Sequence, residues 1–129
     1  MKDALLTPAE WHVLECLWDH GPCSGREAVE QLSKAVGWSR STVLTMLRRM
    51  DEKGLIESFE DASGIRIYKA NMDRDAATMD QTEDFLHRIY HGSIGMMLSA
   101  FTKKQTLSRE EIDQLYAILD NAKGGASHD

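Results

Sequence analysis

The chain has 129 residues, of which 42% are hydrophobic and 28% charged, and its formal net charge is −6 at pH 7. This length suits one compact domain or a small domain with an accessory segment, and the composition excludes collagen-like and wholly disordered classes. No apolar run approaches the roughly 20 residues that a membrane-spanning helix needs, and the first residues lack the apolar core of a secretory signal. We therefore expect a cytoplasmic protein.

Acidic residues outnumber basic ones in both parts of the chain. The net charge is −2 over residues 1–70 and −4 over residues 71–129. Because nucleic-acid-binding domains usually carry net positive charge, any anion-binding surface in this chain has to be local. The run WSRSTVLTMLRRM, residues 38–50, meets that requirement, since it holds three arginines and no acid.

Three helix starts can be located from capping boxes. In each, a hydroxyl accepts a hydrogen bond from a backbone amide, and a glutamate three residues later returns the bond. The boxes are Thr7-Pro8-Ala9-Glu10, Ser24-Gly25-Arg26-Glu27 and Ser108-Arg109-Glu110-Glu111. We expect the first helix to end before Gly21-Pro22 and the second, over about 24–35, to end before Gly37.

A third helix is predicted over residues 39–53, with Gly54 at its C-terminal cap. The hydrophobic period then changes to two in LIESFE and IRIYKA, which are separated by the turn residues DASG, so these segments predict a β-hairpin. Three helices followed by a hairpin form a winged helix-turn-helix, which we assign to residues 1–71. The predicted fold class is mainly α with a small β-hairpin.

Further helices are expected at about 73–91, 93–102 and 108–122. Three short helices bury too little surface to form a core alone, so we assign residues 72–123 to dimerisation and residues 124–129 to a disordered tail. The apolar residues predicted to form the dimer interface are Phe85, Leu86, Ile89, Tyr90, Ile94, Met97, Leu98, Phe101, Leu115 and Leu119.

The third helix has the features of a DNA-reading helix. Its core stripe on a helical wheel is opposed by a face with Ser41, Thr45 and Arg48, flanked by Leu44 and Arg49. A helix in the major groove needs small hydrogen-bonding residues near its N-terminus and cations along its sides. We therefore predict a helix that reads bases and anchors phosphates, although the same pattern also fits a solvated face.

The start of this helix strengthens the DNA-binding interpretation. Thr42 stands where the capping boxes have glutamate, and Arg40 lies in the first turn. A carboxylate there would favour the helix dipole by about 0.3–1 kcal/mol, but it would repel a phosphate approaching the backbone amides. In the predicted wing, Arg66 is the residue placed to reach DNA, because Glu60 and Asp61 at the tip resist phosphate.

Cysteine and histidine residues recur along the first helix. His12, Cys16 and His20 are spaced by four, with Cys23 just beyond, so one helix face could present them to a metal. Cys16 is equally consistent with an ordinary buried residue against the hairpin. His87 and His91 repeat the spacing, but aromatic neighbours favour a packed dimer helix. We predict no metal site, no cofactor and no enzymatic site, since no nucleophile, base and orienting group form a recognisable set.

Several segments together resemble the penicillinase-repressor (BlaI/MecI) family of bacterial transcriptional regulators, whose copper-responsive relatives are the CopY type. The matching segments are LTPAEWHVLECLW, WSRSTVLTMLRRMDEKGLIE, FLHRIYHGSIGMMLSAF and LSREEIDQLYAIL. The resemblance implies a homodimeric repressor whose two recognition helices bind a palindromic double-stranded operator.

The resemblance also adds site residues. Family hydroxyl positions correspond to Ser39, Thr42 and Thr45, and family basic positions correspond to Arg49 and Lys53. Leu44 departs from the family pattern, because many relatives carry a cation there. The operator sequence therefore does not transfer from those relatives.

The family's induction route implies a membrane sensor metalloprotease and cleavage of the repressor at an Asn-Phe bond. The aligned residues here are Ala100-Phe101, so Phe101 is either part of a cleavage site or a core residue. The tail contains no cysteine, which argues against the CopY metal hooks. The alternative function is a winged-helix protein-interaction module that does not bind DNA and uses its acidic C-terminal half.

Overall fold

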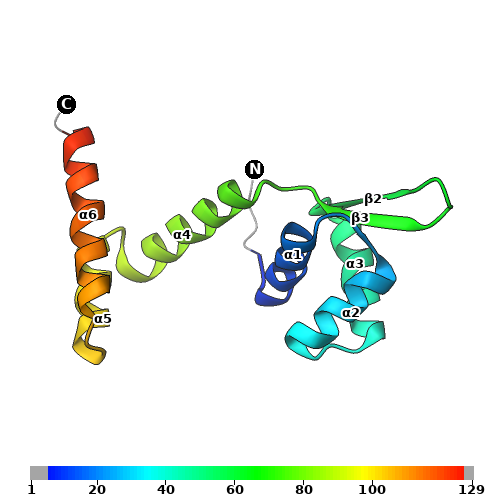
Figure 1. Ribbon diagram of the computed structural model, residues 1–129, viewed down its shortest axis with the longest axis horizontal. Coiled ribbons are helices and arrows are strands. Elements are labelled where there is room, and N and C mark those ends of the chain that lie inside the picture. Colours follow the sequence, from blue (N-terminus) through cyan, green and yellow to red (C-terminus); the bar gives the residue numbers. More distant parts are fainter. Residues whose placement is uncertain (1–5, 127–129) are drawn as a thin grey trace. The chain divides into compact units, whose positions relative to one another are not determined.

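The computed structural model describes residues 6–126. Contacts divide the chain into two compact units, Met1–Glu83 and Asp84–Asp129. The elements along the chain are α1 (Pro8–His20), β1 (Cys23–Ser24), α2 (Gly25–Val36), α3 (Arg40–Glu52), β2 (Ile56–Glu60), β3 (Arg66–Ala70), α4 (Arg74–Tyr90), α5 (Ile94–Lys104) and α6 (Arg109–Ala126) (Figure 1). This mainly helical chain with a small antiparallel sheet confirms the predicted fold class.

All three predicted capping boxes are confirmed. At α1 the Thr7 side chain accepts from the backbone of Glu10, whose carboxylate accepts from the Thr7 amide. The same exchange starts α2, and reciprocal bonds of 2.9 and 3.0 Å precede α6. Gly37 ends α2 in the left-handed conformation, with φ of 73°, where a glycine avoids the strain of a Cβ atom.

The sheet has one strand more than the sequence predicted. Its order is β1-β3-β2, and all pairings are antiparallel. The predicted hairpin is present as β2 and β3, and a strand that was not predicted joins it, because Cys23 and Ser24 of β1 pair with Tyr68 and Ile67. Two residues are too few to show a period, so only the tertiary fold reveals this strand.

The core of the first unit lies where α1, α2 and α3 meet the base of the sheet. The hairpin of β2 and β3 extends from these helices as a wing (Figure 1). Val43, Leu47 and Met50 of α3 are fully buried, whereas Met46 of the same helix is only partly buried. The other buried core residues are Val13, Leu14, Cys16 and Leu17 of α1, Cys23 of β1, Ala28 and Leu32 of α2, and Ile56 of β2.

The start of α4 is fastened to α1. The indole Nε1 of Trp18 donates to the Met72 carbonyl at 3.0 Å. The Arg74 guanidinium lies 5.4 Å from the centre of the Trp18 ring and 2.7 Å from an oxygen of Asp19. These contacts lie beyond residue 71, where the winged helix-turn-helix was predicted to end, and the first compact unit runs to Glu83. The predicted domain boundary stays a prediction.

The second unit contains the end of α4 together with α5 and α6. No residue of α5 is buried. Residues 124–126, which the sequence assigned to a disordered tail, form the last turn of α6, and the rest of that tail lies outside the described residues. Between residues 6 and 126, no helix has the length and apolar character needed to cross a membrane.

Candidate nucleic-acid interface

The N-terminus of α3 presents hydroxyl groups to solvent. Ser39 is the N-cap and accepts from the Thr42 amide at 3.2 Å. Its hydroxyl also donates to Thr42 Oγ1 at 3.1 Å and lies 3.4 Å from Ser41 Oγ. These three residues are exposed, and the first turn contains no acid. The hydroxyl cluster therefore caps the helix and leaves its amide end electrostatically open to an anion.

Three arginines extend from α3 into solvent. Arg48 lies 3.8 Å from Glu52, but both side chains are more than 60% exposed, and such surface pairs contribute only about 0–1 kcal/mol. Within residues 6–126, Arg40 and Arg49 form no ion pair. All three guanidinium groups are therefore free to bind phosphate at little electrostatic cost.

A short hydrogen-bond chain connects Arg66 of the wing to α3. The Ser58 hydroxyl donates to Asp51 at 2.6 Å and accepts from Arg66 Nη1 at 2.8 Å. A second guanidinium nitrogen of Arg66 lies 3.8 Å from Glu60. Asp51 belongs to α3, Ser58 to β2 and Arg66 to β3, so the chain joins three elements.

An open hollow of about 460 Å³ lies between α3 and the wing, and two of the predicted arginines line it. Its lining residues are Leu44, Thr45, Arg48, Asp51, Arg66 and Tyr68. Arg48 and Arg66 supply positive charge from two sides, while the Asp51 carboxylate is engaged by Ser58. The hollow thus combines cations with the Thr45 hydroxyl on one face.

Leu44 is less available than its predicted place on the DNA-facing side suggested. Its side chain is half-buried and packs against the core cluster. A Cβ atom added at Gly25 would lie 3.4 Å from Leu44 Cδ2 and 3.8 Å from the Tyr68 ring. Leu44 therefore packs where α2, α3 and β3 meet and contributes an apolar wall to the hollow.

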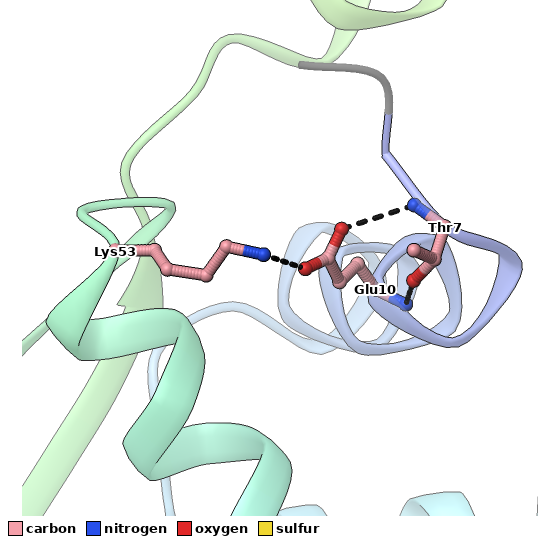
Figure 2. Close-up of polar contacts among 3 residues, drawn as sticks. All are labelled: Thr7, Glu10 and Lys53. Atoms are coloured by element: carbon pink, nitrogen blue, oxygen red, sulfur yellow. Dashed lines mark hydrogen bonds and ion pairs between the residues drawn. The ribbon is translucent and has the colours of Figure 1, made fainter.

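Lys53, which the family resemblance made a DNA-contact candidate, forms a contact within the fold. Its ammonium group forms an ion pair with the Glu10 carboxylate, which also accepts from the Thr7 amide (Figure 2). Glu10 is 6% exposed, whereas the Lys53 side chain is 56% exposed. A phosphate contact by Lys53 would have to compete with this ion pair.

Two opposing effects act on the pKa of Glu10. Burial raises the pKa, whereas the hydrogen bonds from Lys53 and Thr7 and the charge of Lys53 lower it, and the net pKa lies below the ordinary value. The carboxylate is therefore charged at neutral pH despite its burial. It ties the N-terminus of α1 to the C-terminal end of α3.

The wing tip is organised by one aspartate. Asp61 Oδ1 accepts from the amides of Ser63 and Ile65 at 2.8 and 3.0 Å. Its carboxylate thus forms the turn, which accounts for an acid at a tip expected to approach DNA. Arg66 remains the cation at this end of the wing.

The predicted dimerisation residues lie in the second unit, in which helix α5 has no buried residue. Leu86, Tyr90, Met97, Leu98 and Leu115 are partly exposed, and Phe85 packs edge-on against Tyr90 with ring centres 6.1 Å apart. The most exposed members are Phe85, Ile89, Ile94, Phe101 and Leu119, which are 44–58% exposed. Ala100 and Phe101 both lie within the helix α5.

The histidine and cysteine stripe of α1 faces α2. His12, Cys16 and His20 line a hollow of about 130 Å³ together with Asp19 and residues of α2. The His12 ring meets Trp38 edge-on, with centres 6.0 Å apart. Within the described part of the chain, no three histidine, cysteine or acidic residues form a group that could hold a metal.

Sequence reasoning missed three residues of this interface. Asp51 and Tyr68 line the hollow with the arginines, and Ser58 is hydrogen-bonded to both Asp51 and Arg66, but none of the three stood out as a binding residue. The strand register contains the signal, because Ser58 pairs with Tyr68 and Glu60 pairs with Arg66. Alternation along both strands then places all four on one face of the wing.

The model of the penicillinase repressor family matches residues 6–121. The chain belongs to the penicillinase repressor family. The family's Bacillus licheniformis penicillinase repressor is 32% identical over 118 residues, which make up 92% of this chain and 91% of that relative. The Staphylococcus aureus penicillinase repressor is 28% identical over 93% of this chain and 94% of its own. MecI, a methicillin resistance regulatory protein from the same species, is 26% identical over 89% and 93%.

One similar solved structure covers just over half of this chain, and another covers nearly all of it. The solution structure of monomeric Bacillus licheniformis BlaI in complex with the blaP half-operator is 30% identical, with a TM-score of 0.51, covering 57% of this chain and 89% of that one. MepR, a transcription regulator of a Staphylococcus aureus multidrug efflux pump, covers 94% of this chain and 80% of its own at 21% identity, with a TM-score of 0.52. The MepR likeness concerns the fold alone. Because the penicillinase repressor family consists of transcriptional repressors, this chain is a transcriptional repressor.

Proposed function

We propose that the protein is a homodimeric repressor that binds a palindromic DNA operator through α3 and the wing. The observation that carries the proposal is the exposed face of α3, which has hydroxyls at an acid-free N-terminus and Arg40, Arg48 and Arg49 along its sides. The relative BlaI has been solved in complex with a half-operator. A winged helix with this face is suited to the major groove.

The residues divide between two tasks in this proposal. Ser41, Thr42 and Thr45 read base edges, while Arg40, Arg48, Arg49 and the wing residue Arg66 bind phosphates. Ser39 acts mainly as the helix cap, Leu44 shapes the groove-facing wall, and Lys53 acts mainly through Glu10.

A second copy of the chain completes the molecule. Between residues 84 and 124 the second unit has no buried apolar residue, and apolar side chains of α4, α5 and α6 are exposed in the monomer. Pairing would remove this surface from water. A two-fold dimer places two α3 helices about one DNA turn apart, which is the origin of the palindromic operator.

Release by proteolysis through a membrane sensor metalloprotease pathway is the remaining part of the proposal. The Ala100-Phe101 bond lies inside α5, whereas proteases prefer exposed flexible segments. Cleavage there requires α5 to unwind locally. Loss of the dimer then lowers operator affinity because the two half-sites are no longer bound together.

The test is fluorescence anisotropy with labelled duplexes from the region upstream of the protein's own gene, over a range of salt concentrations. Affinity should fall steeply with salt because bound phosphates release counterions. Arg48→Ala and Arg49→Ala should each lower the slope of log K against log salt by about one. Thr45→Ala should change base preference by about 1–3 kcal/mol.

The matched control is Arg109→Ala, which removes the same charge from a side chain 85% exposed in the second unit. The Arg109→Ala variant should bind DNA with the same affinity and salt dependence as the wild type. No salt-dependent binding to any upstream duplex would overturn the proposal in favour of a protein-interaction module. Equal affinity, specificity and salt slope in the α3 variants would remove α3 from the interface.

A further inference from the structure

Cys16 and Cys23 lie together in the first unit, outside the DNA-facing surface. Cys16 belongs to α1 and Cys23 to β1, and both are free thiols buried in the same core cluster, at 7% and 5% exposure. Each side chain perturbs the pKa of the other, so the two thiols are close neighbours within this cluster. Two neighbouring thiols in one core are candidates for a disulfide bond.

One of the two sulfurs has a route to small molecules. Cys16 lines the 130 Å³ hollow between α1 and α2, whereas Cys23 is absent from its lining. The other lining groups include His12, Asp19 and His20, so the hollow is polar enough to admit water-sized solutes. An incoming oxidant would therefore meet Cys16 first.

The thiols also differ chemically. The hydrogen bond from Cys23 lowers the pKa of Cys16, although burial and the charge of Asp19 oppose this. The bond to Cys16, burial and nearby negative charge all raise the pKa of Cys23. Cys16 is the thiol that lines the hollow, and the thiolate is the reactive form, so Cys16 is the attacking thiol and Cys23 the partner that resolves the product.

We propose that Cys16 and Cys23 form a peroxide-reactive dithiol that closes to an intramolecular disulfide. The Cys16 thiolate attacks the peroxide O–O bond, forming a sulfenic acid and releasing an alcohol or water. The Cys23 sulfur then displaces the sulfenic hydroxyl, which leaves as water with the Cys23 proton. Two thiols and one peroxide thus yield one disulfide, one water and one alcohol or second water.

The bond has a structural consequence for the first unit. Cys23 pairs with Tyr68 of β3, and β3 carries Arg66. A disulfide therefore links α1 covalently to the sheet that forms the wing. Gly21, between the two cysteines with φ of 76°, makes the intervening turn.

The test treats the folded full chain with hydrogen peroxide and then blocks free thiols with iodoacetamide. Both cysteines fall in one tryptic peptide, Asp3 to Arg26, so an intramolecular disulfide appears as that peptide lacking two hydrogens and any alkyl group. We expect the disulfide to form at least tenfold faster in the folded protein than in the free Asp3–Arg26 peptide. A folded protein that keeps both thiols while the free peptide oxidises overturns the proposal, as does a disulfide between two chains.

Two variants assign the roles. Cys23→Ser should stop at the sulfenic acid of Cys16, which dimedone captures as a stable adduct, and Cys16→Ser should protect Cys23 at least tenfold. Thermal melting checks that each variant is folded. Rapid oxidation of Cys23 in a folded Cys16→Ser protein contradicts the assignment. If either variant fails to fold, the wild-type comparison with the peptide still decides the proposal.

Discussion

Glu10 is a buried carboxylate that serves two elements. One oxygen accepts from the Thr7 amide and the other pairs with Lys53. Removal of one partner of a buried group costs more than loss of the bond alone, because the remaining polar group stays unsatisfied. The carboxylate can stay charged in the core only because both partners are present.

Lys53→Met should therefore lower the free energy of unfolding by about 1–3 kcal/mol, as measured by urea unfolding at pH 7. Methionine keeps the aliphatic stem but leaves the Glu10 charge unpaired. Lys34→Met, at an exposed position of α2, is the matched control and should leave the unfolding free energy nearly unchanged. Equal stabilities of Lys53→Met and the wild type would show that the ion pair contributes nothing.

The pH dependence follows from the lowered pKa of Glu10. A carboxyl whose pKa is lower in the folded state stabilises the fold fully above its ordinary pKa, and the contribution is lost as the pH falls through the folded value. The stability difference between wild type and Glu10→Gln should thus be largest near pH 7 and shrink below about pH 4. A constant difference between pH 7 and pH 3 would contradict this assignment.

Ser58 should matter for DNA binding only through Arg66, given the proposed function. It holds the guanidinium against α3 by way of Asp51. In a double-mutant cycle of Ser58→Ala and Arg66→Ala, we expect a coupling of about 0.5–3 kcal/mol in operator affinity. Ser63→Ala, an exposed change at the wing tip, should show no coupling, and purely additive losses for Ser58 and Arg66 would rule out positioning.

At the scale of elements, capping chemistry made the helix starts predictable. The signals are local, since each box spans four residues, and local bonds survive any tertiary arrangement. Ser39→Ala should destabilise the protein by about 0.5–2 kcal/mol, measured by thermal or urea unfolding, because it removes the cap of α3. Ser41→Ala, two residues later, keeps the capping bond between the Thr42 amide and the Ser39 hydroxyl and should cost much less. Equal costs would contradict the capping role.

The parts that the sequence could not predict depend on residues far apart in the chain. Strand β1 exists because two residues meet β3, and Lys53 finds Glu10 across 43 positions. The wheel placed Leu44 beside the DNA-facing side, but its contact with the position of Gly25 is visible only in the fold. Periodicity therefore predicted which faces of α3 are buried, and packing decided which exposed residues remain available.

At the scale of the whole molecule, the two units differ in how their apolar residues are used. The first has a buried core, whereas α5 in the second has no buried residue. Stability of the proposed dimer should therefore depend on concentration. Melting temperature should rise with protein concentration, and sedimentation should reveal a dimer.

Ile94→Asp should raise the dimer dissociation constant at least about tenfold, because burial of one large apolar side chain contributes roughly 1.5–3 kcal/mol. Ile94 is 58% exposed in the monomer, so the monomer itself should tolerate the change. Ser99→Asp, on the same helix and exposed, is the control and should leave the dissociation constant unchanged. A monomeric wild type at all concentrations would refute the dimer.

The ion pair of Glu10 and Lys53 has a direction as well as an energy. A lysine at position 10 could not accept from the Thr7 amide and would place a cation beside the positive end of α1. The reversed pair, Glu10→Lys with Lys53→Glu, would restore opposite charges yet leave the Thr7 amide without the carboxylate that accepts its hydrogen bond. The two residues of this ion pair therefore cannot exchange positions. The acid must stay on α1 and the base on the segment after α3.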